Sequence, residues 1–265
     1  MSTSTVRIDP ADPGRAASAA AALATLPLSY TEGGDDAEVV VIAGSDGWVE
    51  RVRAAATRGA RGVIVTDPLP EAEAIDLAAD PPDCFVVLAE PWASSPALRS
   101  TAEQFGAPIS RAHLVDARAV EPVSGRSLRT VLFSQLRAVQ NLGMEIASLS
   151  IAAESSSSIL GVGRSVSGTR VVLSAARTDV GDGTLDILLV GRDETIRVEL
   201  PNSTTARPGR AVLTSAIAAV EVPTTWETAH RSSWLALRDA FATGVQPGHV
   251  ETFAQAISLV DAAQR

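Results

Sequence analysis

Four acidic residues stand where a parallel sheet would present side chains to a ligand. Asp9, Asp46, Asp67 and Glu90 each follow an apolar, strand-like run. Because ligands of such a sheet meet the carboxyl ends of its strands, we expect these acids, with Trp92, to line a cleft. Two interpretations stay open. The acids are helix caps and solvated loop residues, or they form an edge that receives a cationic ligand or a partner's arginine.

Both interpretations count against an anionic cofactor at that edge. Several carboxylates together repel a pyrophosphate by roughly 1 kcal/mol or more per close charge pair, even under solvent screening. The sequence therefore predicts no NAD(P) and no other cofactor.

Other chemically active side chains are sparse. His113, His230 and His249 are far apart in the sequence and lack metal-ligand spacing, so no metal site is predicted. We expect His230 and His249 to face solvent or another subunit. Cys84 is the one cysteine, which excludes an intrachain disulfide, and it precedes the apolar run 85–88, where a small buried side chain is expected. The chain has no lysine, which excludes lysine chemistry.

Three further patterns have ordinary and functional interpretations. Residues 161–168, Gly-Val-Gly-Arg-Ser-Val-Ser-Gly, loosely resemble a phosphate loop, but they lie among predicted strands rather than before a helix, which favours a turn. A Ser-His-Asp triad stays open, although no Gly-x-Ser-x-Gly elbow is present. Trp226 and Trp234 fall on nearly one face of a predicted helix, where they pack in a core or interface or form a platform for a sugar.

The first half of the chain alternates short apolar runs with helical stretches, which is typical of a parallel α/β sheet. The predicted strands are 6–9, 28–31, 38–43, 62–66 and 85–89. The predicted helices between and after them are 14–26, 46–58 and 95–105.

The second half has a different pattern. A helix is predicted over 127–143 because its apolar residues fall on one face. Strand-like segments follow, with turns at 181–183 and 191–193, and two helices close the chain. These strands are 146–153, 169–176, 184–190 and 195–200, and the closing helices are 226–243 and 250–263. We therefore expect an α/β fold: a truncated Rossmann-like parallel sheet in residues 1–110, then an α+β domain with a mostly antiparallel sheet in residues 111–265.

Composition narrows the class of protein. The 265 residues carry a net charge of −9, and the arginines are scattered, which argues against a nucleic-acid partner. No apolar run approaches bilayer length and no export signal is recognisable, so we expect a cytoplasmic protein without a membrane partner.

Several segments carry a family resemblance. Residues 37–43 and 54–68 follow the pattern D-x-V-x-I-A … A-x-x-x-G-x-x-V-x-x-E-K-P, and 96–99, 241–247 and 256–263 match further segments in the same order. In this order and spacing, nearly the whole chain resembles the Gfo/Idh/MocA family of sugar and inositol dehydrogenases. The resemblance implies a Rossmann-like half, a second half with a sheet, and association through the open face of that sheet.

Departures from the family pattern carry the functional expectation. The G-x-G-x-x-G loop is missing, and residues 6–10 look like the family's second strand, as if the chain began one βα unit late. Thr66-Asp67-Pro68 stands where the family has Glu-Lys-Pro, with its catalytic lysine. The family's Asp/His pair should fall within Arg129 to Arg137, which contains neither residue.

We therefore expect a non-catalytic or regulatory subunit, assembled through the C-terminal sheet as a homo-oligomer or with an active dehydrogenase. Two alternatives remain: an NAD(P)-dependent or cofactor-free enzyme acting on a sugar or cyclitol-like substrate, and a small-molecule-binding protein.

A topological expectation follows from hydrogen bonding. An empty central slot in the sheet would orphan buried backbone groups at about 1–3 kcal/mol each. We therefore predict that Val6 to Asp9 takes the central position, parallel to Val39 to Ala43. The helix 14–26 then forms the first crossover, and 28–31 an outer strand.

Overall fold

The computed structural model describes residues 3–9, 13–26, 29–202 and 207–263. The chain forms two compact units, and each is described by itself. The first consists of Met1–Glu90 and Ala229–Ile257, and the second of Pro91–Thr228 and Ser258–Arg265. Within the described ranges, no helix combines the length and apolar character needed to cross a bilayer.

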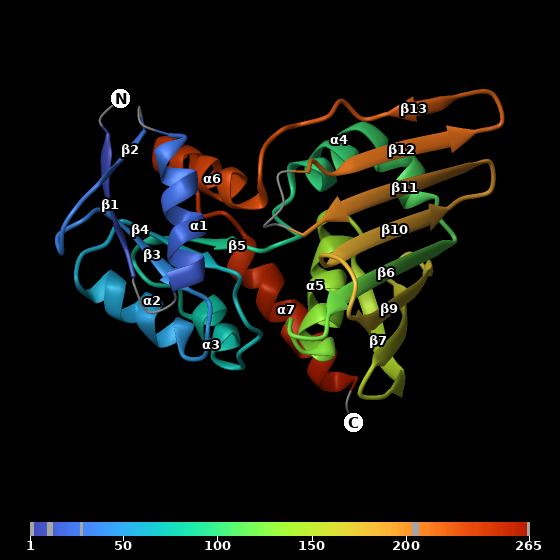
Figure 1. Ribbon diagram of the computed structural model, residues 1–265, viewed down its shortest axis with the longest axis horizontal. Helices are drawn as coiled ribbons and strands as arrows, with labels where there is room; N and C mark the ends of the chain where they lie inside the picture. Colours follow the sequence, from blue (N-terminus) through green and yellow to red (C-terminus); the bar gives the residue numbers. More distant parts are fainter. Residues whose placement is uncertain (1–2, 10–12, 27–28, 203–206, 264–265) are drawn as a thin grey trace. The chain divides into compact units, whose positions relative to one another are not determined.

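The first unit contains a five-stranded parallel sheet (Figure 1). Its strands are β1 (Ser4–Ile8), β2 (Tyr30–Glu32), β3 (Val39–Ala43), β4 (Gly62–Thr66) and β5 (Phe85–Ala89). Its helices are α1 (Pro13–Ala24), α2 (Trp48–Thr57), α3 (Glu73–Ala79), α6 (Ala229–Thr243) and α7 (His249–Ala262), the last of which belongs to this unit as far as Ile257.

The strand order β2-β1-β3-β4-β5 confirms the predicted topology. Val6 pairs with Val39 and Ile8 with Val41, both in parallel register, so β1 lies inside the sheet. β2 forms the outer strand beside β1, as expected, although Leu28 of the predicted strand lies outside the described residues. Each interior backbone edge is thereby paired, which is the physical reason for placing β1 in this slot.

Helices cover both faces of the sheet, as its fully buried strands require. All five residues of β3 and of β4 are buried. α1 and α6 contact each other, and their apolar residues form one core with Val39, Val41 and Ile64 (Figure 1). The alternate residues of β3 point to the opposite face, where α2 contacts β3 and β4.

α6 returns from the far end of the chain to seal this core. The Tyr30 hydroxyl donates to the carbonyl of Trp234 at 2.9 Å, and the two rings pack edge to face. The sequence pattern placed Trp226 on the same helix as Trp234. In the structure, Trp226 precedes the helix and is 77% exposed. The expectation that the two tryptophans share a packed helix face is wrong, since three residues before Ala229 are not helical.

The second unit contains an eight-stranded sheet in the order β13-β12-β11-β10-β6-β9-β8-β7. All its pairings are antiparallel except that of β6 with β9, so the fold class agrees with the prediction. Its elements are α4 (Pro96–Ser110), β6 (Leu114–Pro122), α5 (Leu128–Asn141), β7 (Ile146–Glu154), β8 (Ser158–Ser165), β9 (Arg170–Thr178), β10 (Thr184–Val190), β11 (Glu194–Pro201), β12 (Arg210–Ser215) and β13 (Ala219–Glu221).

α4 and α5 cover one face of this sheet, and the other face carries ion pairs. Arg118 pairs with Asp116 within β6, and Arg197 pairs with Asp186 across β11 and β10. The strands therefore alternate between a buried apolar face and a polar outer face.

Two turn predictions have different outcomes. Residues 191–193 connect β10 and β11, which are antiparallel neighbours, so this hairpin is confirmed. Residues 181–183 do not form a hairpin between neighbours, because β6 lies between β9 and β10.

Candidate functional site

The carboxyl edge of the five-stranded sheet brings four of the five predicted cleft residues into one unit. Asp9, Asp46, Asp67 and Glu90 follow β1, β3, β4 and β5. Trp92 belongs to the second unit, where it is 1% exposed and its ring contacts the guanidinium of Arg126.

The loops after β3 and β4 pack backbone against backbone. The N–H of Gly44 donates to the carbonyl of Thr66 at 2.7 Å, and the N–H of Leu69 donates to the carbonyl of Gly44 at 2.8 Å. A Cβ atom on Gly44 would lie 2.3 Å from the Cα of Pro68, so this position requires glycine. The edge is therefore built tightly at β3 and β4.

Arg51, from the first turns of α2, places a positive charge at this edge. Its guanidinium donates to the carbonyls of Ala43, Ser45 and Asp46 at 2.8 to 2.9 Å. Ala43 is the last residue of β3, and Ser45 and Asp46 lie between that strand and α2. The edge thus contains a fixed cation among its acids, which the sequence pattern alone did not indicate.

Asp67 has an unusual backbone. Its φ angle of 48° is the one positive value of a non-glycine residue in the described part of the chain. Such a conformation costs of order 1–3 kcal/mol and gathers at functional positions, although aspartate tolerates it better than most residues. The N–H of Asp67 donates to the carbonyl of Ala89 at 3.0 Å, which holds the loop against the end of β5.

His230 approaches Asp67 from α6. Its Nε2 lies 4.0 Å from Oδ1 of Asp67, beyond hydrogen-bond range. Both Oδ1 of Asp67 and Nδ1 of His230 are buried without a hydrogen-bond partner. The expectation that His230 faces solvent or a subunit is wrong, because the residue is 7% exposed and packs inside the unit. A carboxylate and an imidazole in this arrangement could exchange a proton after a shift of about 1 Å.

The sequence of residues 9–14 does not offer the donor set that a dinucleotide needs. A pyrophosphate is held by backbone N–H groups of a glycine-rich turn at a helix N-terminus. Here the sequence from 9 to 14 is Asp-Pro-Ala-Asp-Pro-Gly, with two prolines that cannot donate and two carboxylates. The residue types in this segment therefore do not fit NAD(P).

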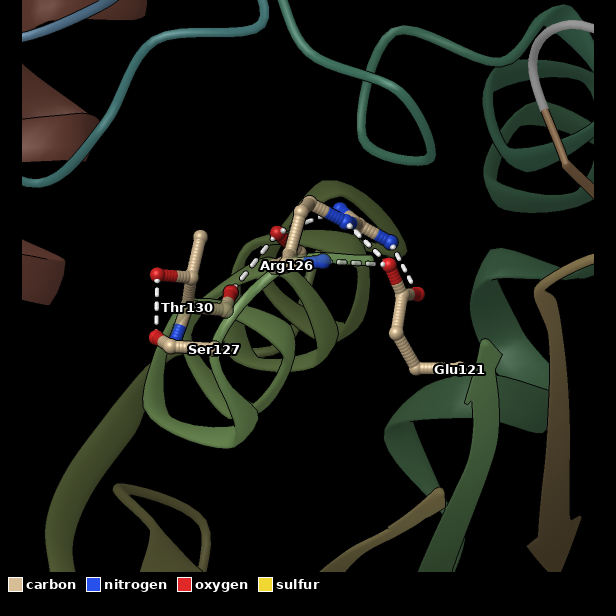
Figure 2. Close-up of polar contacts among 5 residues, drawn as sticks. Glu121, Arg126, Ser127 and Thr130 are labelled. Carbon is tan, nitrogen blue, oxygen red and sulfur yellow. Dashed lines mark hydrogen bonds and ion pairs between the residues drawn. The ribbon is translucent and has the colours of Figure 1, made fainter. Parts of the chain in front are cut away.

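The second unit holds a separate polar cluster at the N-terminus of α5. Glu121, in β6, accepts from the backbone N–H of Arg126 at 2.9 Å and from its guanidinium at 3.2 and 3.0 Å (Figure 2). The guanidinium also lies 4.6 Å from the ring centre of Trp92. Since the Glu121 side chain is 6% exposed, this ion pair is largely removed from water.

Hydroxyl groups complete the cluster. Ser127 caps α5 by accepting from the N–H of Thr130 at 3.1 Å, and the two hydroxyls lie 2.8 Å apart (Figure 2). Ser134, one turn further, accepts from Arg126 at 3.2 Å and donates to the carbonyl of Thr130 at 2.9 Å. Three N–H donors of Arg126 already occupy the Glu121 carboxylate, and the other side chains of the cluster are a guanidinium and hydroxyls.

Glycine lets the Glu121 carboxylate sit close to the backbone. A Cβ atom on Gly125 would lie 2.5 Å from its Oε1, and one on Gly183 would lie 3.1 Å from its Oε2. Neither Glu121 nor Arg126 was predicted as a site residue. The available signal was an acid five residues before an arginine, next to a glycine and a helix cap, but the strand that carries Glu121 was not recognised.

Metal-binding geometry is absent from the residues that the structure describes, since no three His, Cys, Asp or Glu side chains gather there.

Comparison with known proteins yields structures but no sequence match. No family model matches the chain, and no curated protein sequence matches it. An oxidoreductase from Sinorhizobium meliloti superposes with a TM-score of 0.74 at 13% identity, covering 100% of this chain and 97% of that one. UDP-N-acetylglucosamine 3-dehydrogenase from Acidithiobacillus ferrooxidans gives 0.72 at 14% identity, with coverages of 100% and 99%. A 3-ketoreductase from Actinomadura kijaniata, in complex with NADP and TDP-benzene, gives 0.72 at 16% identity, with coverages of 99% and 97%.

The chain therefore shares the fold of these three solved oxidoreductase structures. The matches span nearly the full length of both chains, so the shared fold extends over both units. At 13 to 16% identity the likeness concerns the fold, and the chemistry has to be argued from the residues of this chain.

Proposed function

We propose that this chain is a non-catalytic or regulatory subunit with an oxidoreductase fold, which acts in an assembly and does not itself turn over NAD(P). The observation that carries the proposal is the N-terminal turn of α5. There, in and beside the segment where the family resemblance places an Asp/His pair, Arg126 is held by Glu121 and surrounded by hydroxyls.

Hydride transfer to or from a carbinol needs a group that takes or gives the hydroxyl proton. An arginine remains protonated throughout the working pH range, and a serine or threonine hydroxyl needs a neighbouring base. The α5 cluster offers no such base, which supports the absence of dehydrogenase chemistry.

The residue types after β1 support the same proposal from the cofactor side. Residues 9–14 contain two prolines and two acids, whereas dinucleotide-binding enzymes have glycines between their first strand and first helix. In addition, Asp67 stands where the resemblance expects a catalytic lysine, so the charge at that position is reversed.

The outer face of the eight-stranded sheet supports assembly. Val120 and Val162 are 38% and 37% exposed on strands of that sheet. They alternate with ion pairs such as Arg197–Asp186. Apolar side chains exposed on a sheet face favour cover by a partner, and paired charges around them suit the polar rim of an interface. We infer association through this face, with a second copy or with an active dehydrogenase of the same fold.

The names of the similar structures suggest the partner's substrate class. Two are a UDP-N-acetylglucosamine 3-dehydrogenase and a 3-ketoreductase, which supports a partner acting on a sugar or a cyclitol-like compound.

The test combines the purified full chain with a dehydrogenase of the same fold from the same organism. The chain alone should reduce neither NAD⁺ nor NADP⁺ with UDP-N-acetylglucosamine, glucose or myo-inositol. Mixed with the dehydrogenase, it should co-elute as one complex and change the enzyme's kcat/KM or melting temperature. Turnover by the chain alone, or no complex at micromolar concentrations with any such dehydrogenase, would contradict the proposal.

A second candidate function is an enzyme with altered chemistry, and the Asp67–His230 pair is the observation that favours it. Buried, unpartnered titratable atoms beside a strained backbone are features of catalytic sites. If the chain shows turnover, Asp67→Asn and His230→Gln should each lower kcat by at least about a hundredfold while the fold is kept. Unchanged kcat in both variants would exclude this pair as the catalytic group.

A further inference from the structure

A hollow of about 860 Å³ lies at one end of the eight-stranded sheet, beside the first residues of β6. Three connections line it: α4 to β6, β8 to β9, and β10 to β11. β6 runs over nine residues from Leu114 at the hollow to Pro122, next to Glu121. At about 3.3 Å per residue, the hollow and the Glu121 cluster are some 25 Å apart, so they are separate sites.

Arginine dominates the charge of the hollow. Its lining includes Arg111, Arg164, Arg170 and Arg192, against the carboxylates of Asp193 and Glu194. Arg111 pairs with Glu194 at 2.6 Å.

The other three arginines have no ion pair in the described part of the chain, although acidic residues outnumber basic ones by 31 to 22. On the same sheet, Arg118, Arg197 and Arg210 each bind a carboxylate. The hollow is therefore a local surplus of positive charge in an acidic protein.

The strand register adds an independent observation. Arg164 in β8 lies directly opposite Arg170 in β9, in antiparallel pairing. Both side chains are exposed, and both alternate with the buried residues of their strands, so they share the outer face. Like charges directly opposite each other destabilise a sheet, and an anion bound between them would remove that cost.

Part of this lining comes from the segment 161–168 that resembled a phosphate loop. The segment is not simply a turn, because its first five residues belong to β8 and only 166–168 form the connection. Ser167 and Gly168 of that connection, together with Arg164, border the hollow.

We propose that this hollow binds a small polyanion with two or more phosphoryl groups. Guanidinium groups bind phosphoryl oxygens through paired N–H donors, and arginines from three separate connections suit two phosphoryl groups better than one. The volume lies in the range of small-molecule sites. The proposal goes beyond the subunit function and does not depend on it.

The experiment is calorimetric titration of the full chain with inorganic pyrophosphate in magnesium-free buffer. We expect one site with a Kd below about 1 mM at 50 mM salt, and weaker binding at 200 mM salt. Arg170→Gln and Arg192→Gln should each weaken binding at least about tenfold, since each removes a charge-assisted contact. Arg99→Gln is the matched control, because Arg99 is an exposed arginine of the same unit outside the hollow, and it should leave the Kd unchanged.

A second measurement distinguishes a binding site from a general charge effect. Arg170→Gln should raise the melting temperature of the free protein by about 1–3 °C, because it removes the opposed charge on Arg164. The same variant should lose most of the stabilisation that pyrophosphate gives the wild type.

ADP distinguishes the sources of the diphosphate. Tighter binding of ADP than of pyrophosphate assigns a nucleotide, and the reverse order assigns a free polyphosphate. No saturable binding of either compound, or equal Kd values in the wild type and in both the Arg170→Gln and Arg192→Gln variants, would overturn the proposal.

Discussion

Glu121 and Glu221 each make a two-point contact with an arginine, but in different surroundings. Glu121 binds Arg126 with a side chain that is 6% exposed, whereas Glu221 binds Arg210 with one that is 47% exposed. Water competes for the second pair and hardly for the first. Loss of the carboxylate should therefore cost more stability at Glu121 than at Glu221.

We predict that Glu121→Gln lowers the free energy of unfolding by about 1–3 kcal/mol, because it leaves the largely buried Arg126 without its counter-charge. Glu221→Gln is the matched control and should leave the urea midpoint nearly unchanged. Urea unfolding followed by circular dichroism measures both. Equal effects of the two substitutions would show that burial does not strengthen the Glu121 pair.

Cys84 gives a pH-dependent prediction. Burial, with a smaller contribution from Asp83, raises the pKa of its thiol to about 11. Since the thiolate is the nucleophile, its population at pH 8 is about a hundredfold below that of a thiol with the ordinary pKa.

Reaction of Cys84 with a disulfide reagent at pH 8 should accordingly be about a hundred times slower in the folded protein than in urea. The folded rate should rise about tenfold per pH unit without levelling off below pH 10. A folded rate that matches the unfolded one, or that levels off near pH 9, would contradict the raised pKa of this half-buried thiol.

At the scale of elements, the parallel sheet was predictable because β3, β4 and β5 are continuous apolar runs with both faces buried. The second sheet was predictable only in part. β6 was not recognised because alanines 117 and 119 supply much of its buried face, and β8 was masked by glycines 161 and 163. Small side chains bury little area, so strands built from them lack the hydrophobic alternation on which prediction depends.

The candidate sites were likewise predictable only in part. The acids at the strand ends were predictable, since sheet topology alone brings Asp9, Asp46, Asp67 and Glu90 to one edge. The approach of His230 to Asp67 joins residues 163 positions apart in the sequence, and the Arg126 cluster depends on a strand that was not recognised. Neither contact leaves a local signal.

The junction of the two loops after β3 and β4 provides a prediction at this scale. Gly44→Ala should lower the free energy of unfolding by at least about 2 kcal/mol, because its Cβ would meet the backbone of Pro68 rather than a side chain that can move. Gly106→Ala is the control, since a Cβ there meets nothing within 4 Å. Thermal unfolding compares the two. Equal melting temperatures would show that the loops separate easily.

At the scale of the whole molecule, the outer face of the second sheet has to be covered or solvated. Its ion pairs favour water, whereas its exposed valines favour a partner. We predict that the protein is not a monomer. Light scattering after size exclusion should give at least twice 27.4 kDa at micromolar concentration. Val162→Arg should reduce that mass if the face is the interface, and a mass near 27 kDa over a wide concentration range would contradict the prediction.

The central claim is that an oxidoreductase fold persists here without its dinucleotide chemistry, and nucleotide binding tests it most directly. Calorimetric titration of the purified full chain with NADH and NADPH should show no saturable binding up to about 1 mM, because the sequence of residues 9–14 offers prolines and carboxylates in place of glycine N–H donors. A micromolar Kd for either nucleotide would contradict the account.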